Sequence, residues 1–143
     1  MAKVAIIYWT GTGNTEEMAN IVSERLQAKD ETVSMFSVDE IEAAEAAEYD
    51  KIALGCPAMG DEVLEEDEFQ PFYDELKPLL KDKPLIIFGS YSWNEGEWMV
   101  KWNEDCKEAG LNLVAAGVAC YEAPDESEEI EALNAIADAL AEA

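Results

Sequence analysis

Residues 10–15, with the sequence TGTGNT, gather hydrogen-bond donors around two glycines directly after an apolar run. The side-chain donors are Thr10, Thr12, Asn14 and Thr15, and the glycines are Gly11 and Gly13. Glycines let the backbone curve close to a ligand. A helix that begins here would add unpaired N–H groups and the positive end of its dipole. This combination is typical of a site for an oxyanion, most simply a phosphate.

The alternative for this loop is an ordinary helix cap beside a tight turn. A cap needs only one Thr or Asn, whereas the loop holds four such donors, so we favour the phosphate site. It is not a Walker A motif, because no Lys-Ser/Thr pair follows the glycines, and Glu16 stands where the dinucleotide fingerprint requires a third glycine. Without Lys or Arg to hold a triphosphate, turnover of ATP or GTP is not expected.

Two further loops carry large side chains that suit a flat ligand. The segment GCPAMGDEVLEEDE (55–68) contains Met59, and GSYSWNEGEW (89–98) contains Tyr91 and Trp93. Thioether and aromatic groups pack well against ring faces, so these side chains predict a slot for a planar aromatic ring. Trp93 lies among polar loop residues, which favours a binding role over core packing. Three other large side chains follow helical spacing and are expected in the core: Trp98, Met99 and Trp102.

The sequence contains no histidine and three isolated cysteines, Cys56, Cys106 and Cys120. This composition excludes Ser-His-Asp and Cys-His nucleophiles, histidine-ligated zinc, disulfide frameworks and CxxC metal sites. Cys56 begins a loop that looks like the start of a phosphatase loop, but no arginine follows and acids surround it, so we expect no nucleophilic role. Chemistry in this chain would depend on carboxylates or on a cofactor.

The formal net charge is −24 at pH 7. Such a chain is repelled by nucleic acid and anionic membranes and attracted by basic protein surfaces, although the charge could also serve solubility alone. No apolar run approaches the ~20 residues that span a bilayer. The first residues, MAKVAIIYW, lack the features of a secretory signal. We therefore expect a cytoplasmic protein in a reducing compartment.

The elements that must position these loops alternate along the chain. Apolar runs predict strands over 4–9, 32–38, 51–56, 84–90 and 111–120. Helical spacing predicts helices over 14–28 and near 39–47, and around the stripes within 69–80, 98–106 and 130–140. Such alternation indicates an α/β fold, a parallel sheet covered on both faces, in one domain over 1–143. Ligands of open parallel sheets bind beyond the carboxyl ends of the strands, which here means the loops 10–15, 56–65, 90–97 and 120–125.

Three motifs together identify a family resemblance. YWTGTGNTE after the first strand, LGCPAMGDEVLEE after the third and FGSYSWNEGEW after the fourth resemble the short-chain flavodoxins of the clostridial and rumen-anaerobe type. The resemblance covers nearly the whole chain. It implies a flavodoxin-like three-layer sandwich, with five parallel strands in the order 2-1-3-4-5 and helices on both faces. It also implies a non-covalent FMN that shuttles between semiquinone and hydroquinone as a low-potential, one-electron carrier.

The resemblance also implies roles for individual residues. The phosphate loop comprises Thr10, Gly11, Thr12, Gly13, Asn14 and Thr15. The second loop comprises Pro57, Ala58, Met59, Gly60, Asp61 and Glu62. Met59 and Trp93 would lie on either side of the isoalloxazine, the Gly60–Asp61 peptide would flip on reduction, and Glu62 would contact the pyrimidine edge. Ser90 and Tyr91 would wrap the ribityl and phosphate, in a third loop that includes Ser92 and Trp93. Thr10 stands where serine is usual, and Ser92 and Asn94 stand where glycine is frequent.

Acidic residues concentrate in the segment DEVLEEDE (61–68), and Glu95 and Glu97 flank the third loop. These acids would lower the potential of a bound flavin, and they would form a docking face for basic-faced redox proteins such as ferredoxin-type reductases and other oxidoreductases. The acidic run at 122–131 is more simply a solvated helix start. Two alternatives remain: an FMN-dependent reductase with its own substrate, and a cofactor-free acidic interaction domain. We expect an electron-transfer protein, not an enzyme, that is monomeric.

Overall fold

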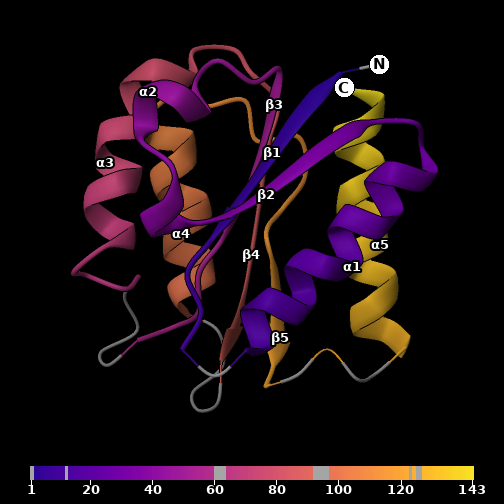
Figure 1. The fold of residues 1–143 in the computed structure, drawn as a ribbon. Coiled ribbons are helices and arrows are strands. Elements are labelled where there is room, and N and C mark those ends of the chain that lie inside the picture. Colours follow the sequence, from indigo (N-terminus) through magenta and orange to yellow (C-terminus); the bar gives the residue numbers. More distant parts are fainter. Residues whose placement is uncertain (1, 12, 60–63, 92–96, 123, 125–126) are drawn as a thin grey trace.

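Five parallel strands form one sheet, in the order β2-β1-β3-β4-β5, with helices on both faces (Figure 1). The computed structural model describes residues 2–11, 13–59, 64–91, 97–122, 124 and 127–143. The strands are β1 (Lys3–Tyr8), β2 (Thr32–Ser37), β3 (Lys51–Gly55), β4 (Leu85–Tyr91) and β5 (Val118–Tyr121). The helices are α1 (Asn14–Ala28), the 3₁₀ turn η1 (Val38–Glu40), α2 (Ala43–Ala46), α3 (Phe69–Leu80), α4 (Glu97–Glu108) and α5 (Ser127–Glu142). The predicted fold class and strand order are confirmed.

The last residues of β1 and β3 are in register with each other and with Phe88 of β4, which continues to Tyr91. Tyr8 of β1 pairs with Gly55 of β3, and Gly55 pairs with Phe88 of β4. The ladder continues one residue further, since the amide of Trp9 donates to the carbonyl of Gly55 at 3.0 Å. The apolar runs of these strands are buried because helices cover both sheet faces. β1, β3, β4 and β5 therefore have their carboxyl ends on the same side of the molecule, toward the bottom of Figure 1.

Two apolar clusters lie on opposite faces of the sheet. α1 and α5 cover one face, and α2, α3 and α4 cover the other (Figure 1). Met18 and Leu133 belong to the first cluster, whereas Phe69, Trp98 and Trp102 belong to the second. The core placement predicted for Trp98, Met99 and Trp102 is confirmed, because each is less than 5% exposed. None of the described helices is long and apolar enough to cross a membrane.

The predicted strand over 111–120 is wrong over its first part. Only Val118–Tyr121 form a strand, and Leu113 makes an isolated bridge to Leu85. Between Leu113 and Val118, Val114 is followed by the sequence AAG (115–117), which contains no β-branched side chain that would favour the sheet. The amide of Gly117 instead donates to Oδ1 of Asn103 at 3.0 Å. Similarly, the helix expected near 39–47 is divided into η1 and α2, because Ile41 between them is extended.

A buried ion pair ties both ends of the chain to the sheet. The ammonium of Lys51 lies 3.3 Å from Oε1 of Glu31, and each side chain is only 9% exposed. The same ammonium donates to the carbonyl of Ala141 at 2.9 Å, and the amide of Ala2 donates to Oε2 of Glu31 at 3.1 Å. This pair thus joins the residue before β1, the first residue of β3 and the last turn of α5.

We predict that Glu31→Gln lowers the free energy of unfolding by about 3 kcal/mol, because a buried ammonium that loses its carboxylate is left with an uncompensated charge. The measurement is urea unfolding of the ligand-free protein, followed by circular dichroism. The expected result is a lower midpoint with an unchanged slope.

The matched comparison is Asp138→Asn at the surface. Arg25 of α1 donates to Asp138 of α5 at 2.7 and 3.0 Å, but this pair is more exposed and should contribute less than about 1 kcal/mol. The hydrogen bond from Arg25 lowers the pKa of Asp138, so this smaller contribution is present at neutral pH and is lost as the pH falls through the lowered pKa. An equal decrease in the free energy of unfolding for Glu31→Gln and Asp138→Asn would contradict the prediction.

Candidate binding cleft at the carboxyl edge of the sheet

A cleft of about 570 Å³ opens where the strands end. This volume lies within the range of small-molecule sites, about 300–1,000 Å³. Its walls come from the segments after β1, β3 and β5, the first residue of α1 and the last two residues of β4, as expected for a doubly wound sheet. The lining residues are Trp9, Gly11, Asn14, Pro57, Ala58, Met59, Ser90, Tyr91 and Glu122. The structure therefore brings three predicted loops together, and the fourth contributes Glu122.

The first loop closes on itself before α1 begins. The hydroxyl oxygen of Thr10 accepts a hydrogen bond from the amide of Gly13 at 2.9 Å. Gly13 has φ 95° and is the N-cap of α1, a conformation that strongly favours glycine. The carbonyl of Gly13 accepts from the amide of Glu17 at 3.0 Å, which starts the helix. The first amides of α1 and the side chain of Asn14 thus lie beside the cleft, where they suit an anion.

A buried pair of hydroxyl groups joins the first loop to β4. Oγ1 of Thr15 and Oγ of Ser90 are 3.1 Å apart, and the residues are 1% and 5% exposed. One of the two hydroxyl groups donates its proton to the hydrogen bond between them, and the other proton remains for another acceptor. Because Ser90 also lines the cleft, donation from Thr15 to Ser90 would leave the Ser90 proton for a ligand.

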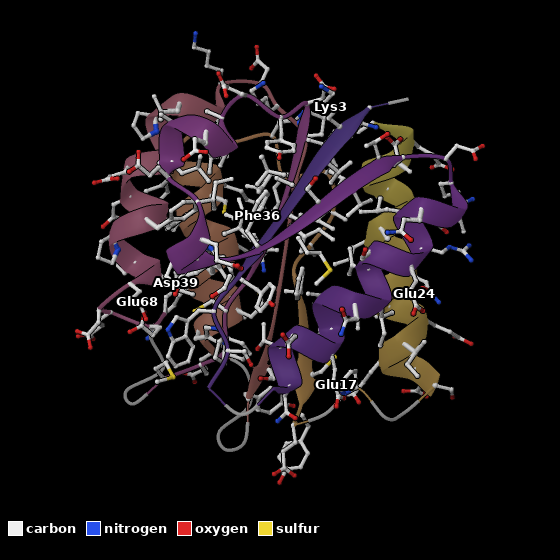
Figure 2. All side chains as sticks on the ribbon, in the orientation of Figure 1. Lys3, Glu17, Glu24, Phe36, Asp39 and Glu68 are labelled. Carbon is white, nitrogen blue, oxygen red and sulfur yellow. The ribbon has the colours of Figure 1, made fainter. Side chains whose placement is uncertain are left out.

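Two side-chain bonds hold the ends of the first loop. The hydroxyl of Tyr8 donates to Glu16 in the first turn of α1 at 2.9 Å. Burial, followed by this hydrogen bond, raises the pKa of Tyr8 to about 12, so the donor proton is retained. The indole of Trp9 donates to Glu68 at 3.2 Å, just before α3. Figure 2 shows Glu68 at the start of α3 and Glu17 at the start of α1. Trp9 was not among the predicted site residues, although its place directly before the loop was a usable signal.

The second and third loops are joined by the backbone. The amide of Ala58 donates to the carbonyl of Ser90 at 2.9 Å, and the amide of Cys56 donates to Phe88 at 3.0 Å. Gly89 is required between these bonds, because a Cβ there would overlap the carbonyl of Cys56. The ring of Tyr91 is held between Trp98 and Tyr121, with centroid distances of 5.7 and 5.6 Å. Met59 and Tyr91 therefore reach the same cleft from adjacent strands.

The fifth strand contributes a carboxylate that the sequence prediction left out of the site. Glu122 adopts φ 54°, and its amide donates to the carbonyl of Tyr91 at 2.7 Å. A left-handed glutamate is uncommon, so this hydrogen bond helps to hold it at the cleft. Among the described residues that line the cleft, Glu122 is the only charged one. The cleft thus combines neutral hydrogen-bond donors with a negative rim.

The remaining predicted residues divide into two groups. Thr10, Gly13 and Thr15 lie next to the cleft through the bonds above, without lining it. Thr12, Gly60, Asp61, Glu62, Ser92 and Trp93 lie outside the described residues. Cys56 is fully buried, and this burial raises the pKa of its thiol far above the ordinary value. A nucleophilic thiolate is therefore disfavoured at Cys56.

Comparison with known proteins gives consistent results. The Flavodoxin family profile matches residues 6–136. The flavodoxin of Megasphaera elsdenii is 39% identical over 131 residues, which cover 92% of this chain and 95% of that protein. The flavodoxin of Clostridium beijerinckii is 39% identical over 124 residues, which cover 87% and 90%. The solution structure of the two-electron reduced M. elsdenii protein superimposes with a TM-score of 0.87 at 38% identity, over 98% of this chain and 99% of that one.

We predict that Thr15→Val weakens binding of FMN about tenfold and leaves binding of riboflavin within about twofold. Valine keeps the shape of threonine but removes the hydroxyl that orients Ser90 at the cleft, so Ser90 would lose its hydrogen bond to the phosphate, and a hydrogen bond to a charged group contributes about 1.5–3 kcal/mol. The measurement is titration of the ligand-free protein by quenching of flavin fluorescence.

Ser23→Ala is the matched control, since Ser23 is a buried hydroxyl residue of the same helix, two turns beyond the cleft. Its affinity for FMN should equal that of the unchanged protein. A loss of riboflavin binding in Thr15→Val as large as the loss of FMN binding would show that the hydroxyl does not act on the phosphate.

Proposed function

This chain belongs to the flavodoxin family and is a small FMN-binding electron carrier, and we propose that it carries single electrons at low potential between redox proteins with basic surfaces. The observation that carries this proposal is the cleft at the sheet edge, which has neutral donors, an aromatic wall and an acidic rim. FMN supplies the one-electron chemistry when it is bound. The protein supplies binding, orientation and the electrostatic surroundings.

The described residues fit FMN at both of its ends. The start of α1, with Gly13 and Asn14, offers amide donors to the phosphate without any cation. Met59 and Tyr91 line the part of the cleft that suits a flat ring. The cleft volume of about 570 Å³ accommodates a ligand of this size. We therefore propose all sixteen residues named from the sequence, together with Trp9 and Glu122, as the FMN site.

The charge around the cleft supports a low potential. Addition of an electron to the ring is disfavoured by nearby negative groups and favoured by positive ones. At ~10 Å and an effective dielectric of about 20, one unit charge contributes about 1.7 kcal/mol. No cation lines the described part of the cleft, whereas Glu122 is at its rim and Glu16 lies in the first turn of α1. These charges would thus lower the potential at which a bound flavin accepts its second electron.

A second group of acids, before α3, favours partner proteins with basic surfaces. Glu66, Asp67 and Glu68 are exposed directly before α3, on the side of the sheet where the cleft opens. A partner with a basic face would be steered to this edge, with an association rate that falls as salt is added. Glu65 of the same run is buried, so its expected place in the docking face is wrong.

We further propose a monomeric, cytoplasmic protein whose residues 1–143 form one flavodoxin-like domain. A single sheet receives helices from both ends of the sequence, which supports one domain. The three cysteines are free and buried, which fits a reducing compartment. The high negative charge opposes association of identical chains. The family relationship does not favour the two alternatives, a reductase with its own substrate or a cofactor-free domain.

Stepwise reduction of the FMN-loaded protein tests this proposal. We expect two separate one-electron steps in the absorbance spectrum, and no oxidation of NADH or NADPH until a reductase is added. The rate with a basic-faced reductase should fall several-fold between low and high salt. Turnover of a nicotinamide cofactor without a partner protein would support the reductase alternative instead.

We predict that Glu122→Gln raises the potential of the second electron by about 30–60 mV, since 1.4 kcal/mol corresponds to about 59 mV for one electron. Glutamine keeps the length of the side chain and removes only its charge. The control is Glu24→Gln on α1, which Figure 2 shows away from the loops that form the cleft and which should change the potential by less than about 10 mV. Equal shifts in the two variants would contradict a local effect of Glu122.

A further inference from the structure

One acid of the 61–68 run differs from its neighbours. Glu65 is 6% exposed, whereas Glu66, Asp67 and Glu68 are exposed. Charged side chains are seldom buried unless they are compensated. The groups that stabilise the buried charge of Glu65 therefore indicate the role of this residue.

The carboxylate of Glu65 accepts three backbone hydrogen bonds. The amides of Glu68 and Phe69 donate to Oε1 at 2.8 Å, and the amide of Asp67 donates to Oε2 at 2.9 Å. These amides precede or begin α3, whose N-cap residue Glu68 provides no side-chain cap. A carboxylate that binds several helix-start amides is fixed in position, because those amides are polar groups that need an acceptor and the helix dipole favours a negative charge there.

The backbone of Glu65 is held as well. Its amide donates to Sγ of Cys56 at 3.4 Å, and its carbonyl accepts from the amide of Gln70 at 2.8 Å. Cys56 is itself fixed at the end of β3, because its amide donates to Phe88 of β4 at 3.0 Å. Cys56, the first residue after β3, is therefore joined to Glu65, which lies four residues before α3.

We propose that Cys56 and Glu65 act as positioning residues, forming a clasp that fixes Pro57, Ala58 and Met59 against the cleft and so sets the affinity for the ring end of FMN. Pro57, Ala58 and Met59 follow Cys56 directly and line the cleft. The chain leaves the clasp at Cys56 and returns to it at Glu65, so opening of the clasp would loosen the wall that Pro57, Ala58 and Met59 form. This inference rests on the proposed function and assigns Glu65 to binding rather than to docking.

The clasp and simple electrostatics predict opposite changes in FMN affinity when the carboxylate charge of Glu65 is removed. FMN carries a negative phosphate, so loss of one carboxylate charge by itself would strengthen its binding. Loss of the clasp would weaken binding, because the ring wall would have to be ordered by the ligand. Riboflavin lacks the phosphate but has the same ring, so the clasp affects both ligands equally.

The experiment compares Glu65→Gln and Cys56→Ala with Glu66→Gln, an exposed neighbour that loses the same charge. Affinities for FMN and riboflavin are measured by fluorescence titration of the ligand-free proteins. Far-UV circular dichroism and urea unfolding establish that each variant is folded during the titration. Amide shifts of residues 67–69, recorded in the ligand-free protein, report the bonds to the carboxylate, and the visible spectrum reports the ring environment.

We expect Glu65→Gln to weaken both ligands about tenfold and Cys56→Ala to weaken both about threefold, with a shifted visible spectrum. Glu66→Gln should bind riboflavin unchanged and FMN equally or more tightly. If Glu65→Gln does not fold, Cys56→Ala decides the question alone. Unchanged riboflavin affinity in folded clasp variants would overturn the clasp, even if they unfold at lower urea. Failure of the unchanged protein to bind FMN would instead overturn the proposed function, and the clasp with it.

Discussion

The binding cleft depends on the parallel register of β1, β3 and β4. Tyr8, Gly55 and Phe88 stand in one row of the ladder, so the chain leaves all three strands at one edge and turns into helices there. A parallel sheet needs a crossover between strands, and each crossover begins with unpaired helix amides. Backbone donors are therefore concentrated at this edge by the topology alone. Side chains such as Thr15 and Ser90 complete the arrangement by joining the loops to one another.

This origin of the donors explains how an acidic protein can hold an anionic group. Amides and hydroxyls offer partial positive charge without a cation, so in the proposed site a bound ring would keep surroundings that disfavour added electrons. The carboxylates at this edge have different tasks. Glu122 lies open at the rim of the cleft, whereas Glu65 is buried on the first amides of α3. Acids that are adjacent in sequence can thus differ in function because of their hydrogen bonds.

The helical stripe predicted α1 to the residue, and the alternating apolar runs predicted a parallel sheet covered on both faces, because such patterns determine buried faces directly. The strand order was predicted only through the family resemblance. It failed at 111–117, where Asn103 competes with the sheet for the amide of Gly117. It also missed Trp9 and Glu122, since their roles depend on the loop conformations that turn them toward the cleft. Glu65 could not be distinguished from Glu66 by type or spacing, because only folding decides which of the two meets the helix start.

The ion pair of Lys51 and Glu31 gathers both chain ends at the pole of the molecule opposite the cleft, where N and C lie near each other in Figure 1. Attaching the protein by either end to an electrode, a bead or a fused enzyme would consequently leave the cleft, the proposed FMN site, facing outward. Circular permutation, in which the two ends are joined and new ends are made elsewhere, would likewise leave the cleft intact.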